Sequence, residues 1–192
     1  MKATIILVLC AAIAVPLFAS EPTTALLIID IQDFYFPGGK VPLVEPEAAA
    51  KNAGRVLAAF RNEGKPVVHV RHEFEPGGAI HASVAPIEGE KVFTKTEVSC
   101  FNGTEVLAHL KEIGVKRLVI VGMQTHMCLE AATRSAYDLG FECVVVGDAC
   151  ATRDLKHGDR TVPAADVHAS TLATLGGTYA KVIDTETFLS GQ

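Results

Sequence analysis

The sequence predicts one α/β domain, built on a doubly wound, mainly parallel sheet with helices on both faces. Apolar runs bounded by turn residues alternate with segments of helical apolar spacing, which is typical of parallel strands joined by crossover helices. The apolar runs are nearly continuous Val, Ile and Leu, which indicates strands covered on both faces. With 192 residues, of which 49% are hydrophobic, the chain fits a single well-packed domain.

Each element follows from a local pattern. The apolar runs predict strands at Ala25–Ile29, Pro66–Val70, Arg117–Val121, Glu142–Val146 and Lys181–Ile183. The helical spacing predicts helices at Glu47–Asn62, Thr104–Ile113, His126–Leu139 and Pro163–Leu175. A glycine follows each helix directly, as a left-handed C-terminal cap would: Gly64, Gly114, Gly140 and Gly176. The stretch from Glu73 to Lys95 is rich in Pro and Gly and has neither period, so we expect a long loop that lines a site.

The charge pattern excludes one class of partner. The formal net charge is −5 and the pI is near 5.8, with no run rich in Lys and Arg. Nothing in the chain would therefore attract a phosphate backbone or an anionic membrane surface. We expect a small-molecule partner and no nucleic acid.

The N-terminus has the pattern of a secretory signal. Lys2 precedes a short apolar run that ends at Phe18, and small residues lie at Ala19 and Ser20. The run is too short to span a bilayer comfortably, although an uncleaved anchor is the alternative. We expect a signal peptide over residues 1–19, a domain over residues 20–192, and an exported protein, periplasmic or secreted, with no stable membrane insertion after cleavage.

Cysteine usage points to one position. Removal of the signal takes Cys10 and leaves four cysteines, at 100, 128, 143 and 150. Their spacing has no framework regularity, and a chain of this length has enough core to fold without disulfides. Cys143 lies in a strand-like run and fits the core. Cys128 differs because it lies where a predicted strand turns into a helix.

Three reactive side chains lie at predicted strand ends. Asp30 ends the first strand, Lys95 follows the long loop, and Cys128 comes after the Arg117–Val121 strand. In a doubly wound sheet the ligand crevice lies outside the carboxyl ends of the strands. Helix-terminal N–H groups and a nearby ammonium favour a thiolate at Cys128, and a partly desolvated Asp30 fits a general base. The backbone N–H groups of Gln124 and Cys128 are the expected donors to an oxyanion.

These segments occur in the order of a known family. They are Leu27–Asp33, Phe101–Thr104 after Lys95, and Gly122-x-x-Thr125-x-x-Cys128, with Gly147-Asp148-Ala149 and Val167-His168 further on. The chain resembles the isochorismatase-like cysteine hydrolases over essentially the whole predicted domain. The resemblance implies an Asp30–Lys95–Cys128 triad, a cis peptide near Met123–Gln124, homo-oligomers, and cleavage of amide or related C–N bonds through an acyl-enzyme. Members that cleave isochorismate characteristically lack this cysteine.

The metal site of nicotinamidases is incomplete in this chain. Those relatives carry an Asp-x-His pair after the second strand, where this sequence reads Val70-Arg71-His72-Glu73. A residual ligand set of His72, Glu73 and His81 is an alternative on residue type alone. We expect no metal and no cofactor, and nicotinamide loses support as substrate.

Proximity to the triad predicts further pocket residues: Phe34, His72, Phe101 and His126. The alternative is that the aromatic side chains pack in the core and the histidines cap or form hydrogen bonds. The leading hypothesis is a hydrolase of a small amide, imide or hydrazide-like molecule. Two other classes stay open: a non-catalytic small-molecule binding module of the same fold, and a thiol redox protein.

Overall fold

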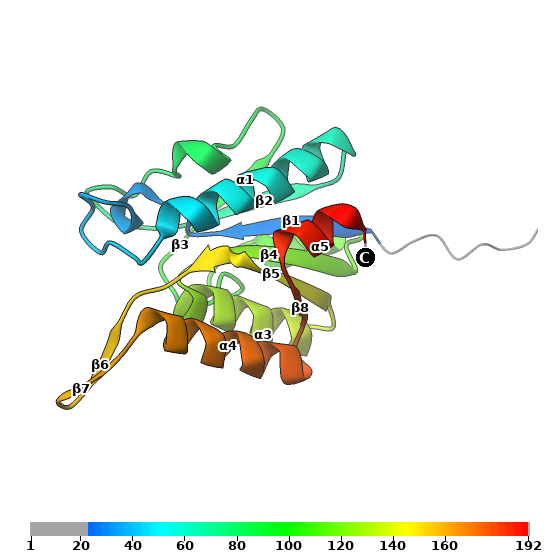
Figure 1. Ribbon diagram of the computed structural model, residues 1–192. Helices are drawn as coiled ribbons and strands as arrows, with labels where there is room; N and C mark the ends of the chain where they lie inside the picture. Colours follow the sequence, from blue (N-terminus) through cyan, green and yellow to red (C-terminus); the bar gives the residue numbers. More distant parts are fainter. Residues whose placement is uncertain (1–22, 192) are drawn as a thin grey trace, which may run out of the picture.

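The fold is a six-stranded parallel sheet between two layers of helices (Figure 1), in the computed structural model, which describes residues 23–191. The strand order is β3-β2-β1-β4-β5-β8, and every neighbouring pair is parallel. The predicted doubly wound α/β class is confirmed. The predicted signal peptide, residues 1–19, lies outside the described residues. Among those that are described, no helix is long and apolar enough to cross a membrane.

The elements follow one another in the alternation that the sequence indicates. The sheet strands are β1 Thr24–Ile29, β2 Val67–His72, β3 Lys91–Lys95, β4 Arg117–Met123, β5 Glu142–Ala151 and β8 Lys181–Ile183. The α-helices are α1 Pro46–Asn62, α2 Val106–Glu112, α3 Glu130–Asp138, α4 Ala164–Thr178 and α5 Thr185–Ser190. Short 3-10 turns lie at Asp33–Tyr35 and Ala82–Val84, and a π-helical turn lies at Thr125–Leu129.

Both faces of the sheet are buried, which explains the continuous apolar runs. In β1, Leu26 and Ile28 pack in the core beneath α1, whereas Leu27 and Ile29 pack in the core on the side of α2 and α3. Successive side chains of a strand point to opposite faces, so a strand covered on both sides needs apolar residues throughout. Figure 1 shows α1 and α5 on one face and α3 and α4 on the other.

The winding of the chain places a crevice between β1 and β4. From β1 the chain proceeds outward to β2 and β3, and it then returns to β4 and proceeds the other way to β5 and β8. After the two strands at such a reversal, the chain turns into the helical layers on opposite faces of the sheet. Ligands bind in the opening between these two connections. Asp30 follows β1 and Gln124 follows β4, so this point carries two of the predicted site residues.

Three expectations need correction. The predicted loop Glu73–Lys95 ends in a strand, β3, and β3 has no continuous apolar run because it is an edge strand with exposed positions. The helix predicted from His126 begins as the π-helical turn, and α3 starts at Glu130. Gly64, Gly114 and Gly140 have the left-handed conformation predicted for them. Gly176 was expected to end a helix but lies inside α4, close to Val182 of β8.

Three further elements have no strong sequence signal. The hairpin strands β6 Leu155–His157 and β7 Arg160–Val162 are short and mostly exposed, and they pair only with each other. Helix α5 has six residues, which is less than two turns and too short for a recognisable apolar period.

A substitution at Gly122, at the carboxyl end of β4, tests how closely β1 and β4 pack at the crevice. Its φ is +139°, and a Cβ there would lie 2.0 Å from the backbone oxygen of Ile29. We expect Gly122→Ala to lower the free energy of unfolding by about 3 kcal/mol or more, because the neighbouring strand would have to move. Gly177→Ala is the matched control, since its Cβ would meet nothing within 4 Å and alanine favours a helix by roughly 0.5 kcal/mol or more. Urea unfolding measures both, and equal stability of the two variants would contradict the prediction.

Candidate active site

The structure brings Asp30, Lys95 and Cys128 together at the carboxyl edge of the sheet. Asp30 directly follows β1 with a φ of +50°, Lys95 is the last residue of β3, and Cys128 lies in the π-helical turn after β4. The three side chains come from three strand ends because those ends meet at one edge of a parallel sheet. The sequence-based grouping of these residues is therefore seen in the geometry.

Lys95 is the centre of this cluster. Its Nζ lies 2.8 Å from Asp30 Oδ2 and donates to Cys128 Sγ at 3.2 Å. The ammonium group also donates to the carbonyl oxygen of Glu97 at 3.1 Å and lies 3.2 Å from His72 Nδ1. Asp30 is 0% exposed and Lys95 2%, so both charges are out of water. A buried charge is tolerated when it is paired in this way.

Burial and charge have opposite effects on the two ionic groups. Burial raises the pKa of the Asp30 carboxyl above 3.8, although the Lys95 ammonium partly lowers it again. Burial alone would lower the pKa of Lys95, but the negative charges of Asp30 and Cys128 outweigh it and the pKa is raised above 10.5. Lys95 therefore stays protonated, and its charge stabilises negative charge on either neighbour.

The Cys128 thiol is not the ready thiolate that the sequence suggested. Burial and then the charge of Asp30 raise its pKa to about 12, and the contact with Lys95 only partly opposes this. The sequence-based expectation considered helix-terminal N–H groups and the ammonium, but not the burial of the side chain. Cys128 is only 6% exposed. At neutral pH the proton lies on sulfur, because the pKa of the thiol is raised to about 12. Nucleophilic attack by this sulfur would therefore require a base to remove the proton.

The turn that carries Cys128, the candidate nucleophile, is held by several side chains. The Met123–Gln124 peptide is cis, as the resemblance implied. Gln124 Nε2 donates to Tyr35 Oη at 3.3 Å, and Gln124 Oε1 accepts from Arg153 Nε at 2.9 Å. These bonds fix Gln124, whose backbone N–H, with that of Cys128, is the candidate donor to an oxyanion.

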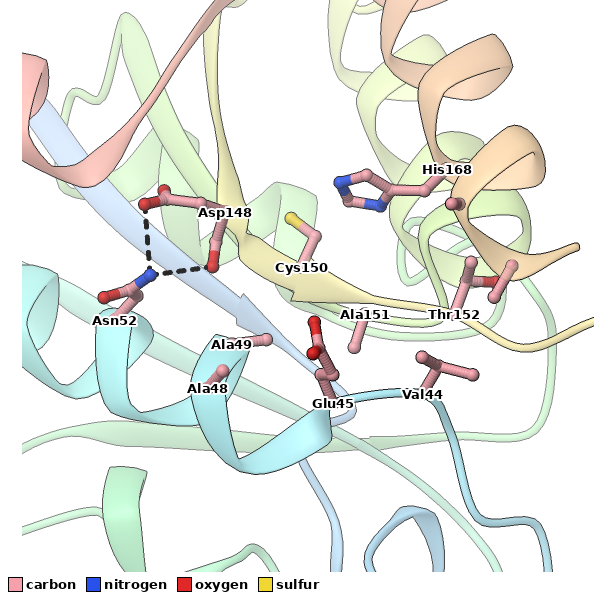
Figure 2. Close-up of a pocket in the computed structure, with 12 residues that line it drawn as sticks. Val44, Glu45, Ala48, Ala49, Asn52, Asp148, Cys150, Ala151, Thr152 and His168 are labelled. Atoms are coloured by element: carbon pink, nitrogen blue, oxygen red, sulfur yellow. Dashed lines mark hydrogen bonds between the residues drawn. The ribbon is translucent and has the colours of Figure 1, made fainter.

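Two threonine–histidine contacts brace the same turn from outside. Thr125 Oγ1 lies 2.9 Å from His168 Nδ1 of α4, and His126 Nδ1 lies 2.6 Å from Thr152 Oγ1 at the end of β5. A cavity of about 400 Å³ lies beyond them, where α1, β5 and α4 meet. Figure 2 shows His168 and Thr152 at this cavity, which no residue of the triad lines.

The predicted pocket residues have different surroundings. His72 contacts Lys95, and His126 belongs to the nucleophile turn. Phe34 packs against Tyr35 and Phe74, with ring centroids 4.1 and 4.2 Å away, and it lines a separate cavity of about 500 Å³. Phe101 lies 6.2 Å from the ring of Phe141 in the core beneath α2 and α3. A place for the two phenylalanines in a substrate pocket stays a prediction.

Sequence reasoning missed Gln32. This fully buried amide donates to the carbonyl oxygens of His72 and Gly78 at 2.9 and 2.7 Å and accepts from the N–H of His72 at 2.7 Å. It thereby joins the segment after β1 to the end of β2, where His72 pairs with Lys95. Its signal in the sequence was a polar residue two positions after Asp30, at the end of an apolar strand.

The alternative metal ligands do not gather. His72 lies against Lys95, whereas the ring of His81 stacks on Phe36 at 3.7 Å and its Nδ1 lies 2.9 Å from Ser83 Oγ. Among residues 23–191 the structure contains no group of three His, Cys, Asp or Glu residues able to hold a metal ion.

These features define a class of α/β proteins that carry a cysteine, a lysine and an aspartate at adjoining strand ends. Residues 24–187 match the family model of the Isochorismatase domain. The chain belongs to the isochorismatase family, and the resemblance to its cysteine hydrolases is confirmed.

Relatives and a solved structure agree with this assignment. The chain is 49% identical to the isochorismatase family protein YddQ of Bacillus subtilis (strain 168), over 87% of this chain and 99% of the relative. It is 30% identical to the maleamate amidohydrolase of Pseudomonas putida (strain KT2440), over 86% and 84%. A crystal structure from Oleispira antarctica, described as an isochorismatase hydrolase, matches with a TM-score of 0.86 and 48% identity over 91% of this chain and 100% of that one.

The protonation state of Cys128 can be measured directly. We expect the ultraviolet absorbance of the Cys128 thiolate, taken as wild type minus Cys128→Ala, to appear only above pH 9.0, since the pKa is raised to about 12. Asp30→Asn removes the negative charge that raises this pKa, so the midpoint moves to lower pH. A wild-type midpoint near neutral pH would contradict the assignment of the proton to sulfur.

Proposed function

We propose that this protein is a cysteine hydrolase that cleaves a C–N bond of a small amide, imide or hydrazide-like molecule through an acyl-enzyme at Cys128. The observation that carries the proposal is the position of Lys95 Nζ, 2.8 Å from Asp30 Oδ2 and 3.2 Å from Cys128 Sγ. The Lys95 ammonium group thus holds the base, Asp30, and the nucleophile, Cys128, side by side in a site buried from water. Such a triad is built for nucleophilic catalysis.

In the acylation step the thiol proton moves to the Asp30 carboxylate while Sγ attacks the substrate carbonyl carbon. The carbonyl oxygen becomes an oxyanion, and the N–H groups of Gln124 and Cys128 stabilise it. As the C–N bond breaks, protonated Asp30 gives its proton to the leaving nitrogen. The products of this step are a free amine or ammonia and a thioester at Cys128.

In the deacylation step the same carboxylate acts on water. Asp30 takes a proton from a water molecule as its oxygen attacks the thioester carbon, and the oxyanion forms again at the same donors. The C–S bond then breaks, and the sulfur recovers the proton from Asp30. Lys95 keeps its charge throughout, since its pKa is raised above 10.5, and it orients both partners without exchanging a proton.

The family relatives support the bond type. The relative from Pseudomonas putida is named for hydrolysis of an amide, maleamate. A thiol redox role has less support, because Cys128 is a free thiol that contacts Lys95, and all four cysteines of the described chain are free and buried. A non-catalytic binding role makes a different prediction about adducts, which the next experiment separates.

The nucleophile can be identified by intact-mass spectrometry of protein incubated with a panel of simple amides and an acylating probe. We expect an acyl adduct or turnover in the wild type and neither in Cys128→Ala, because among the described cysteines Cys128 is the one whose sulfur accepts a hydrogen bond from the Lys95 ammonium. Cys143→Ala is the matched control, since Cys143 is buried in the core and its Sγ faces backbone oxygens. Hydrolysis that survives in Cys128→Ala would refute the proposal, and ligand binding without any adduct would favour the binding role.

The acid limb of the pH–rate profile reports the base. Asp30 must be ionised to take the thiol proton, and burial raises its pKa above 3.8. Activity is therefore expected to fall as the pH drops through a value above 3.8, not at the value of a solvated aspartate. The measurement is kcat/KM against pH for wild type and Asp33→Asn, whose carboxyl is exposed. An acid limb at or below 3.8, or one that Asp33→Asn moves, would contradict this assignment.

A further inference from the structure

We propose that the cavity between α1, β5 and α4 binds a small primary ammonium ligand that also carries a hydrogen-bond acceptor, such as a hydroxyl or carbonyl oxygen. None of Asp30, Lys95 and Cys128 lines this cavity, so the inference goes beyond the proposed function and does not depend on it. Two side chains, Glu45 and His168, hold the two ends of the ligand.

The cavity has the volume and the walls of a small-molecule site. Its volume of about 400 Å³ lies within the range of ligand pockets, roughly 300–1,000 Å³. Figure 2 shows the Glu45 carboxylate pointing into the cavity from the start of α1 and the His168 ring pointing into it from α4, with Cys150 of β5 between them. Small side chains leave the space open: Ala48, Ala49, Ala151, Ala164 and Ala165.

Glu45 gives no support to the helix that it precedes. Its φ is +50°, and its side chain forms no capping hydrogen bond with α1. Left-handed backbone is unfavourable for a residue with a Cβ, and glycine is the usual residue in such a place. Within residues 23–191, the other non-glycine residue with a positive φ is Asp30, in the candidate active site. Backbone strain of this kind is frequent at functional sites.

The Glu45 carboxylate is also the free charge of the cavity. Within residues 23–191 it takes part in no ion pair and no hydrogen bond. The other carboxylate at the cavity, Asp148, is already used: Oδ1 accepts from the N–H and the hydroxyl of Thr185, and Oδ2 accepts from Asn52 Nδ2. Among the described residues that line the cavity none is a lysine or an arginine, so the cavity favours a cation.

His168 supplies a donor at the opposite wall. Thr125 is fully buried, and within the described chain its hydroxyl contacts only His168 Nδ1, at 2.9 Å. A buried hydroxyl proton needs an acceptor, so Thr125 donates to Nδ1. Burial lowers the pKa of His168, and the ring is therefore neutral at pH 7 and carries its proton on Nε2. This N–H has no partner among residues 23–191.

The two groups fit opposite ends of one ligand. An ammonium group donates a charge-assisted hydrogen bond to Glu45, and an uncharged oxygen accepts from His168 Nε2. A carboxylate at the second end is disfavoured, because Glu45 and Asp148 already make the cavity negative. A short apolar chain between the two polar ends contacts the alanine walls.

Two probes test the charge preference: 4-amino-1-butanol and 1,4-butanediol differ in an ammonium group against a hydroxyl. NMR titration of the 15N-labelled protein measures both Kd values and locates binding at the amides of Ala151 and Ala165 and the ring of His168. We expect the aminoalcohol to bind about tenfold more tightly than the diol, and this preference to disappear in Glu45→Gln. Glu47→Gln is the matched control, because Glu47 is exposed in the first turn of α1 and does not line the cavity.

Glu45→Gly separates a ligand-binding role from a structural one. Glycine adopts a positive φ freely and is accepted at the position before a helix. We therefore expect this variant to have a Tm at least as high as the wild type, while it binds 4-amino-1-butanol about tenfold more weakly. A lower Tm would show that Glu45 supports α1 and would overturn its assignment to a ligand.

Cys128→Ala separates this cavity from the candidate active site. Because Cys128 does not line the cavity, the variant is expected to bind 4-amino-1-butanol with an unchanged Kd, whether or not the proposed hydrolysis is correct. The inference would be overturned by loss of binding in Cys128→Ala, by equal Kd values of the two probes in the wild type, or by the absence of shifts at the cavity residues.

Discussion

The rest of the site depends on one buried ammonium group. Lys95 has almost no contact with water, so its charge requires the carboxylate of Asp30 within hydrogen-bond distance. Lys95 ends the edge strand β3 and Asp30 follows β1, with β2 between them. The pair can form only if these three strands keep their parallel register, which Gln32 reinforces by bonding across the ends of β1 and β2. Fold and site are therefore coupled through this ion pair.

The same burial decides how the nucleophile works. Because the pKa of Cys128 is raised to about 12, little thiolate is present at neutral pH. In the proposed mechanism its attack therefore depends on Asp30 as the base. This arrangement also suits the export that the N-terminal pattern predicts. Oxidation proceeds through the thiolate and needs access, so a protonated, nearly buried thiol survives in an oxidising compartment. The protonated state of Cys128 and its proposed activation by Asp30 both follow from the burial of the site.

Sequence patterns predicted what depends on neighbouring residues along the chain. Continuous apolar runs are sufficient to locate β1 and β4, because strands buried on both faces need them. Asp30 and Cys128 were predicted because reactive side chains at strand ends must meet, and the family order of motifs agreed. Edge strand β3 was not predicted, because its exposed face breaks the apolar run. The contacts of Tyr35 and Arg153 were not predicted for another reason. Each forms a hydrogen bond with Gln124 that only the folded chain brings together, from 89 and 29 positions away.

The two halves of the sheet, on either side of the reversal between β1 and β4, contribute different residues to the candidate site. The half that contains β1 to β3 supplies Asp30 and Lys95, whereas the half that contains β4 and β5 supplies Cys128, Gln124 and Arg153. Contacts from β5 and α4 hold the nucleophile turn, and none of them involves the ion pair. Residues after β5 can therefore vary without disturbing the buried charges. A site divided in this way at the reversal of strand order allows relatives to keep one reaction and alter the molecule on which it acts.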